Sequence, residues 1–309
     1  MINKKLYSTK IKKFQMEGIM RYLIATIFLS ILLLSVLSCS NKDNPVGDND
    51  GNNENNFLYP IKIGNKWEYF REYSKLNFRP DTLDTSQVPD TTVTSTVIIS
   101  IARKETILDT IQTYVFHEIL TEEGDQTFED ESYYNNLAGG LYLYAYRGAG
   151  WVIPKSNVSR KILFKGRYFN SIREVTSFIE KALPNKFAIS DTLIYEIPPI
   201  QSIKYPLETG SQWIYRQSGN PWRMDKKVLG KETVKVPAGD FNCWKIQWLY
   251  DIDKNGEWDN DIIFYDYICS MGLIRRYILF KDMEWRGENN EYLGLFDSKD
   301  ESVLTKINL

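Results

Sequence analysis

The chain has 309 residues, of which 43% are hydrophobic and 25% charged, and this composition excludes a largely disordered protein. Once the basic leader (residues 1–38) is set aside, 32 basic and 39 acidic residues remain, a net charge of −7. An acidic chain is poorly matched to a phosphate backbone, so we expect no nucleic-acid partner.

The N-terminal segment is basic first and apolar second. Residues 1–21 carry the basic side chains, and residues 22–38 form an almost unbroken apolar run. This order is typical of a secretory signal. The ending Val36-Leu37-Ser38-Cys39 resembles the lipobox of bacterial lipoproteins, in which the cysteine becomes lipidated and N-terminal. We therefore expect a lipoprotein signal peptide over 1–38 and a palmitate-bearing membrane anchor on Cys39. The alternative is a membrane-spanning helix, which needs about 17–25 apolar residues.

Residues 39–56 are polar and of low complexity. Val46 is the one apolar side chain between Ser40 and Asn56, so the segment buries too little surface to offset its ordering entropy. We expect a disordered tether between the lipid and the folded part. Ser40 stands where Asp would signal retention in the inner membrane, which favours the outer membrane. The face of that membrane stays open.

The folded part opens with a stretch that occurs twice, at residues 59–69 and 205–215. Five of the eleven positions are identical: Tyr59 and Tyr205, Pro60 and Pro206, Gly64 and Gly210, Trp67 and Trp213, and Tyr69 and Tyr215. After a Gly-containing turn, each copy alternates with period 2, which predicts a half-buried strand with Trp67, Tyr69 and Arg71 on one face. The aromatic side chains either form the core of their own repeat, which their size favours, or provide a ligand platform.

The two halves also match further along the chain. The additional pairs are Lys104-Glu105-Thr106 with Lys231-Glu232-Thr233, Tyr133-Tyr134 with Tyr265-Asp266, and Gly140-Leu141 with Gly272-Leu273. We therefore predict β repeat one over residues 57–150, and β repeat two with C-terminal strands over residues 204–309. Within repeat one, the β-branched and turn residues predict a long exposed loop at 79–92, a strand at 93–101, and a hairpin of 112–120 with 131–144.

Residues 151–203 are predicted to connect the repeats. Residues 171–183 are the best helix candidate, since apolar residues recur at helical spacing between a Ser171 N-cap and the stop at Pro184. The predicted fold class is mainly β, with two related antiparallel repeats forming a curved sheet or half-barrel and one connecting helix.

Residues 251–259 match the first nine positions of an EF-hand-type calcium loop, with Gly256 at the sharp turn. The side chains that would offer oxygen are Asp251, Asp253, Asn255, Glu257 and Asp259. Ile262 occupies position 12, where a bidentate Glu belongs, and strands rather than helices are predicted on either side. The alternative is a polar hairpin turn at Asn255-Gly256. Calcium is the only cofactor that the sequence suggests.

Lipidation of Cys39 would leave two other cysteines, Cys243 and Cys269. A hairpin centred on Gly256 places them opposite each other, because each lies 13 residues from that glycine. An exported protein can keep a disulfide. A Cys243–Cys269 disulfide and two buried thiols are both compatible with this spacing.

Two sequence motifs of repeat two resemble those of a known group of proteins. The phrases Tyr-Pro-Leu-x-x-Gly-x-x-Trp at 205–213 and Val-Pro-Ala-Gly-x-Phe at 236–241, with a later Gly-Leu, look like those of uncharacterised cell-envelope lipoproteins of Bacteroidota and related bacteria. The resemblance covers most of residues 57–280 and implies an antiparallel β fold. It implies no activity, and no functional residue beyond Cys39.

Catalysis has little support in the sequence. His117 is the only histidine, no nucleophile elbow or Gly-rich phosphate loop is present, and we predict no catalytic residue. We expect a non-enzymatic envelope lipoprotein whose β domain binds a ligand or an envelope protein partner. A sizeable apolar pocket between sheet and helix would favour a ligand carrier, whereas a solid core would leave a surface interaction or scaffold protein. The alternative is a glycan-acting hydrolase with paired carboxylates, which only their separation in space would reveal.

Overall fold

The computed structural model describes residues 57–80, 92–122, 127–148, 161–181, 193–217 and 222–309, which belong to one compact unit. The predicted signal peptide, Cys39 and the tether lie outside the described residues. Within the described ranges, no helix has the length and apolar character needed to cross a membrane.

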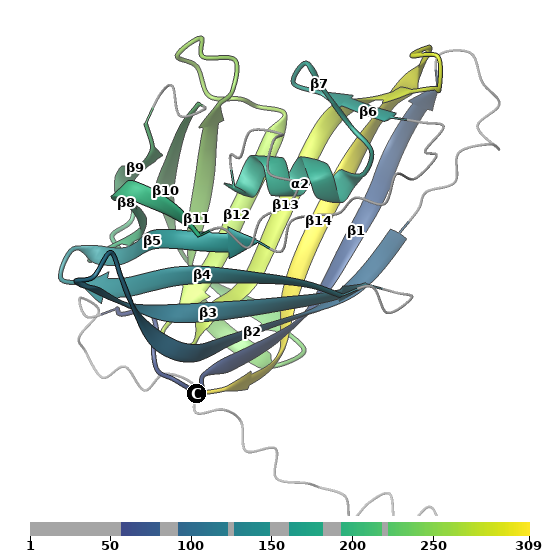
Figure 1. The fold of residues 1–309 in the computed structure, drawn as a ribbon. Coiled ribbons are helices and arrows are strands. Elements are labelled where there is room, and N and C mark those ends of the chain that lie inside the picture. Colours follow the sequence, from purple (N-terminus) through teal and green to yellow (C-terminus); the bar gives the residue numbers. More distant parts are fainter. Residues whose placement is uncertain (1–56, 81–91, 123–126, 149–160, 182–192, 218–221) are drawn as a thin grey trace, which may run out of the picture. The chain divides into compact units, whose positions relative to one another are not determined.

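The described residues form one antiparallel sheet and one helix, as predicted (Figure 1). The elements are β1 (Lys66–Pro80), β2 (Thr92–Ile107), β3 (Ile111–Glu122), β4 (Thr127–Leu137), β5 (Gly140–Gly148), β6 (Lys161–Phe164), β7 (Arg167–Phe169), α2 (Ile172–Lys181), β8 (Ile194–Lys204), β9 (Gln212–Arg216), β10 (Arg223–Val236), β11 (Gly239–Asp251), β12 (Ile262–Cys269), β13 (Gly272–Arg286) and β14 (Tyr292–Asn308). The mainly β fold class is confirmed.

The sheet curves into a nearly closed, barrel-like wall. Its strand order is β8-β5-β4-β3-β2-β1-β14-β13-β12-β11-β10-β9, with β6 and β7 attached beside β13. The pairing of β1 with β14 joins a run made of β1 to β5 and β8 to a run made of β9 to β14. The predicted connector over 151–203 contains β6, β7 and β8 as well as α2. The division into two repeats stays a prediction.

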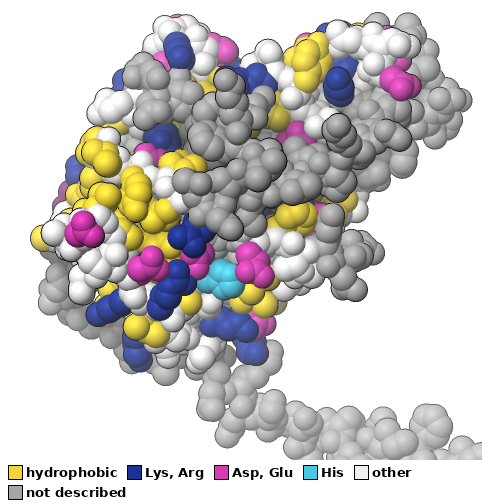
Figure 2. Space-filling view, viewed as in Figure 1, with side chains coloured by type: hydrophobic (Ala, Val, Ile, Leu, Met, Phe, Trp, Pro, Cys, Tyr) yellow, Lys and Arg dark blue, Asp and Glu magenta, His cyan; other side chains and the backbone are white. Residues whose placement is uncertain are grey.

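The two ends of the strand path, β8 and β9, are joined by side chains. Trp213 Nε1 donates to the Gln201 carbonyl at 2.9 Å, and Arg216 Nη2 lies 2.6 Å from Glu196 Oε1. Hydrophobic side chains gather over this edge of the molecule (Figure 2), and Tyr195, Ile197 and Ile214 are among the exposed ones. In the described part of the chain, β8 and β9 form no backbone ladder with each other, and these side-chain bonds connect them instead. The barrel is therefore close to closed.

Burial along β1 follows the predicted alternation. Trp67, Tyr69, Arg71 and Tyr73 are buried, whereas Phe70 between them is 42% exposed. Both tryptophans belong to core clusters, as predicted. Trp213 packs mainly with residues of its own half, whereas Trp67 packs with residues of both halves, and its Nε1 donates to the Met271 carbonyl in the β12–β13 turn. Trp67 reaches residues far along the chain because the strand order places β1 beside β14.

The two copies of the repeated stretch lie against each other. The Tyr205 hydroxyl accepts a hydrogen bond from the Tyr59 backbone N–H at 2.9 Å and donates to Asn136 Oδ1 at 2.8 Å. Asn136 Nδ2 in turn donates to the Tyr59 carbonyl. This closed set of bonds fixes the entry to β1 beside the chain that leads into β9.

Most predicted elements of repeat one are found, with one correction. The strand predicted at 93–101 lies within β2, and β3 pairs with β4 around residues 123–126, which lie outside the described residues. The segment 131–144 is not one strand: it turns before Gly140 and returns as β5. The turn has a local signal, the pair Gly139-Gly140, which the prediction did not use. Gly140 is also required by packing, since a Cβ there would lie 2.1 Å from the Ile203 carbonyl oxygen of β8. Of the predicted loop 79–92, residues 81–91 lie outside the described part.

The helix α2 begins where the sequence predicts. Ser171 Oγ accepts a hydrogen bond from the Glu174 backbone N–H, and the Glu174 carboxylate accepts one from the Asn170 backbone N–H. These two bonds satisfy N–H groups at the helix start. The buried face of α2 packs into a cluster with inward side chains of β10 to β14; its members include Val175, Phe178, Ile179, Trp222, Tyr250, Phe264 and Phe280. In Figure 1, α2 lies across the strands rather than along them.

Gly272 offers a test of the contact between the halves. Its φ is +108°, and a Cβ there would lie 2.7 Å from Trp67 Nε1. We expect Gly272→Ala to lower the free energy of unfolding by more than the ~1–3 kcal/mol that a strained backbone costs. Gly64→Ala is the matched control, because Gly64 also has positive φ but nothing lies within 4 Å of its Cβ position. Urea unfolding of both variants measures the difference, and equal losses would contradict the role of the Trp67 contact.

Candidate functional site: a cavity inside the barrel

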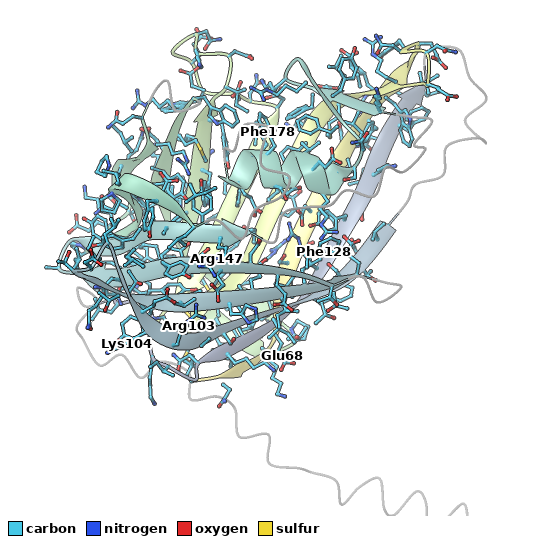
Figure 3. All side chains as sticks on the ribbon, viewed as in Figure 1. Glu68, Arg103, Lys104, Phe128, Arg147 and Phe178 are labelled. Atoms are coloured by element: carbon cyan, nitrogen blue, oxygen red, sulfur yellow. The ribbon has the colours of Figure 1, made fainter. Side chains whose placement is uncertain are left out.

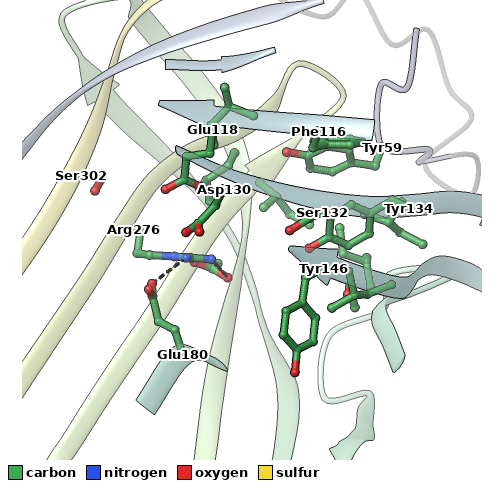
Figure 4. Close-up of a pocket in the computed structure, with 18 of the residues that line it drawn as sticks. Tyr59, Phe116, Glu118, Asp130, Ser132, Tyr134, Tyr146, Glu180, Arg276 and Ser302 are labelled. Carbon is green, nitrogen blue, oxygen red and sulfur yellow. Dashed lines mark hydrogen bonds and ion pairs between the residues drawn. The ribbon is translucent and has the colours of Figure 1, made fainter. Parts of the chain in front are cut away.

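The inward side chains line a partly open cavity of about 270 Å³. Every strand along the path from β8 to β9 contributes to its wall, as does α2 (Figure 4). The wall is rich in aromatic side chains, which are Tyr59, Tyr69, Phe116, Tyr134, Tyr146, Tyr215 and Trp248. The sequence produces this wall by alternation, since residues two apart on a strand face the same side. Phe116 and Glu118 on β3 are one example.

The repeated stretch contributes both to the core clusters and to the wall of the cavity. Its tryptophans, Trp67 and Trp213, are buried in core clusters. Its tyrosines Tyr59, Tyr69 and Tyr215 line the cavity. Burial raises the pKa of all three phenols, that of Tyr215 to about 12, so they stay neutral hydrogen-bonding groups at physiological pH.

A charged network crosses the cavity between β13 and the helix. Arg276 on β13 binds Asp266 on β12 with two hydrogen bonds of 2.7 and 3.1 Å, and its Nη1 lies 2.8 Å from Glu180 on α2. Trp248 Nε1 donates to the same Asp266 at 2.8 Å. Burial opposes the charge of Arg276, but the two carboxylates outweigh it and raise the pKa of the guanidinium. The network ties the helix to the sheet directly over the cavity (Figure 4).

Two further arginines on the wall have buried carboxylate partners. Arg71 on β1 makes hydrogen bonds of 3.0 and 2.8 Å to Asp300 on β14. Arg216 on β9 pairs with Glu196 on β8, across the seam of the barrel. Removing one member of such a pair leaves an uncompensated buried charge, so these pairs constrain the geometry of the wall strongly.

The helix is held at its other end by Arg173. Its guanidinium lies 3.4 Å from the centre of the Phe128 ring on β4, and its Nη1 lies 2.6 Å from Glu122 Oε1 on β3. Phe178 on the same helix lies on Trp222, with ring centroids 4.7 Å apart. Phe128 and Phe178 are labelled in Figure 3; the contacts of α2 therefore reach from β3 and β4 to Trp222, which directly precedes β10.

Lys226 on β10 is the lysine among the residues that line the cavity. Its side chain is buried, and Nζ donates to the Ser202 carbonyl at 2.9 Å. Nζ also lies 3.6 Å from the centre of the Trp248 ring and 4.5 Å from that of Tyr215. Burial lowers the pKa of the amine to about 7, although Asp266 acts in the opposite direction. Sequence reasoning missed Lys226, as it missed every charged residue of the wall except Arg71.

Arg71 shows which signal was present in the sequence. It was predicted to share the buried face of β1 with Trp67 and Tyr69, and an arginine on an apolar face indicates a buried polar partner. Its partner, Asp300, lies 229 residues away. The sequence pattern at Arg71 indicates a buried polar partner, but it does not indicate where a cavity lies.

The single histidine does not reach the cavity. His117 Nε2 lies 3.1 Å from Glu129 Oε2 on the neighbouring strand, with a quarter of its side chain exposed. Its neighbour in sequence, Glu118, faces inward and stands opposite Asp130 in the β3–β4 register; both carboxylates line the cavity. Residues directly opposite on antiparallel strands have Cβ atoms about 4.5–5.5 Å apart.

The predicted calcium loop folds around a lysine. Lys165, from the β6–β7 turn, places Nζ 2.7 Å from Asp259, 2.9 Å from Asp261 and 3.4 Å from Asp253. Burial opposes its charge, but the hydrogen bonds to Asp259 and Asp261 outweigh it and raise the pKa of the ammonium. The ammonium thus stands among the carboxylates that were predicted to bind the ion.

The other predicted ligands of this loop are used by the turn itself. Asp251 accepts hydrogen bonds from the backbone N–H groups of Asn255 and Gly256, and Asn255 Oδ1 accepts one from that of Glu257. Within the described ranges, no group of three or more His, Cys, Asp or Glu side chains is arranged to hold a metal ion. Calcium binding stays a prediction, and it would require displacement of Lys165.

The two cysteines lie as the hairpin argument predicts. Trp244 pairs with Ile268 in the β11–β12 ladder, so the next position of that register places Cys243 opposite Cys269. Both cysteines are buried in one core cluster. The disulfide stays a prediction.

Comparison with known proteins gives two similar structures. No family model and no curated protein matches the sequence. A protein described as exported, with a YmcC-like fold, from Bacteroides fragilis is 15% identical; the match covers 82% of this chain and 99% of that one, with a TM-score of 0.32. A protein described as a lipoprotein, from Parabacteroides distasonis, is 16% identical, with 82% and 98% covered and a TM-score of 0.32. At such scores the likeness carries no argument about function, which is argued below from the cavity.

Lys165 provides a test of the calcium loop. We expect the unmodified protein to show no saturable heat on titration with millimolar Ca²⁺, because the ammonium already neutralises the carboxylates. Lys165→Met leaves Asp253, Asp259 and Asp261 without that charge, so calcium should bind weakly and raise the melting temperature of the variant. Lys254→Met, on an exposed lysine of the same loop, is the control. Tight binding to the unmodified protein would instead support a true calcium site.

Proposed function

We propose that this protein is a non-enzymatic, lipid-anchored protein of the bacterial cell envelope that binds a small ligand inside its barrel. The observation that carries the proposal is the cavity of about 270 Å³. Protein interiors are close-packed, with few voids larger than a water molecule, and ligand sites measure about 300–1,000 Å³. The space inside the barrel lies just below that range and is far larger than a water-sized void, and its wall carries aromatic and charged side chains, so we interpret it as a site for a small ligand rather than as a packing defect.

The chemistry of the wall restricts the kind of ligand. Apolar side chains such as Leu143, Ile203 and Ile246 alternate with charged ones such as Lys226 and Arg276. A carrier of long acyl chains would need a continuous apolar lining. The mixed wall is better suited to a small molecule with an apolar body and polar groups, which the aromatic rings can stack against and the polar side chains can orient.

The anchor is proposed from the sequence. The apolar run that ends at Cys39 and the polar segment 40–56 together would place the barrel at the end of a flexible tether on the membrane. Ser40 favours the outer membrane. A tethered binding domain of this kind samples the solution beside the membrane without a fixed orientation.

A second candidate is a glycan-acting hydrolase. One observation favours it: Glu118 and Asp130 are opposed on adjacent strands and both line the cavity. A retaining glycosidase places its two carboxyl groups about 5–5.5 Å apart. Ligand binding remains the first proposal, because α2 lies across the strands over the cavity and is fastened to the sheet at both ends, whereas a polymeric glycan needs an open groove.

Filling the cavity should abolish binding. We expect the neutral fluorescent probe N-phenyl-1-naphthylamine to bind saturably, and Leu143→Trp to weaken that binding at least tenfold, because the indole occupies the cavity. Leu229→Trp is the matched control, since Leu229 is 39% exposed and does not line the cavity. Fluorescence titration, with circular dichroism to check folding, measures the effect. Equal affinity in both variants would place the probe elsewhere and contradict the proposal.

The anchor can be tested on the full chain expressed in a bacterium. We expect radioactive palmitate to label the protein and mass spectrometry to find Cys39 at the mature N-terminus. Cys39→Ala should lose both the label and the cleavage, whereas Cys243→Ala should keep them. An unlabelled protein that retains residues 1–38 would instead support the membrane-spanning helix.

A further inference from the structure

Lys226 differs from the other cations of the cavity wall. Arg71, Arg216 and Arg276 each bind a carboxylate, and Arg147 lies 3.8 Å from Glu131. In the part of the chain that the structure describes, no carboxylate lies within ion-pair distance of Lys226, which is only 5% exposed. A buried ammonium without a counter-ion is costly, because burial removes its hydration and nothing replaces the charge.

The surroundings of Lys226 provide weak compensation. Its amine donates to the Ser202 carbonyl, and the rings of Trp248 and Tyr215 lie beside it. The charged groups that act on it are Asp266 from β12 and Arg276 from β13. Asp266 already has other partners, since its carboxylate accepts two hydrogen bonds from Arg276 and one from Trp248. The amine therefore lacks a negative partner, and its pKa of about 7 reflects that lack.

We propose that the cavity binds a small organic carboxylate with an aromatic or apolar body, and that Lys226 holds its anionic group. This inference rests on the proposed ligand-binding function and names the chemical class of the ligand. The carboxylate would provide the counter-ion that Lys226 does not find among the described residues. Its body would lie against Trp248, Tyr215 and Ile246, which also line the cavity.

The wall favours a carboxylate over a phosphate. A phosphate is usually held by several donors, commonly arginine forks or backbone N–H groups. Here the arginines of the wall have their own carboxylates, and Lys226 offers one ammonium. One charge on the protein matches one charge on the ligand. The acidic pair Glu118 and Asp130 would further disfavour a multiply charged anion.

The test uses three probes that share a body and differ in charge: phenylacetate, the neutral phenylacetamide and the cationic phenethylamine. Each is titrated calorimetrically into the full chain, purified in mild detergent, at pH 8. We expect phenylacetate to bind at least tenfold more tightly than phenylacetamide. At this pH the amine of Lys226 is mostly neutral, so binding of the anion should take up close to one proton. Titrations in two buffers with different ionisation heats measure that proton.

Two variants assign the effect to Lys226. Lys226→Met should lose the preference for phenylacetate and the proton uptake but keep its affinity for phenylacetamide. Lys227→Met is the control, because this neighbouring lysine does not line the cavity, and it should behave like the unmodified protein. If Lys226→Met does not fold, proton uptake by the unmodified protein still decides the proposal.

The outcomes separate this inference from the function on which it rests. Equal affinity for phenylacetate and phenylacetamide, a preference for phenethylamine, or binding without proton uptake would each overturn the role of Lys226. If N-phenyl-1-naphthylamine binds in a Leu143-dependent way while phenylacetate does not, the cavity is a ligand site of another chemistry. If none of the four compounds binds, the proposed function fails together with the inference.

Discussion

Closure of the sheet is the constraint on which the rest of the structure depends. When a twisted sheet curves until its first and last strands meet, every second side chain must point into a shared interior. In a barrel with this many strands, those side chains do not fill the centre completely. The seam between β8 and β9 is closed by Trp213 and Arg216 rather than by a ladder, so the wall keeps a continuous inner surface. The cavity is a consequence of that geometry.

Each charged side chain inside the barrel needs a partner of opposite charge, because burial removes its hydration. Arg71, Arg216 and Arg276 are tolerable inside because each reaches a carboxylate on a neighbouring strand, and Arg276 also draws the helix onto the wall through Glu180. Among the described residues, no carboxylate lies within ion-pair distance of Lys226. A buried titratable group in a cleft whose pKa is shifted by desolvation is a candidate for a functional site, and Lys226 meets that description.

How far the sequence predicts this molecule depends on the range of the interactions. The alternation of β1, the N-cap of α2 and the opposition of Cys243 and Cys269 are local or hairpin features, and they were predicted. The partner of Arg71 is 229 residues away, and Lys165 enters the 251–259 loop from 94 residues away. Local pattern matching found the acidic loop but could not find the lysine that neutralises it, because the curvature of the whole sheet brings them together.

Some matched positions of the predicted repeat line the cavity in both halves. Tyr69 and Tyr215 both line it, as do Leu141 and Leu273. At a third matched pair the two halves differ, with Tyr134 in one and Asp266 in the other. Asp266 recruits Arg276 and Trp248, and through them it shapes the surroundings of Lys226. The carboxylate at this one pair therefore gives the cavity wall a polar end that the matched tyrosine does not provide.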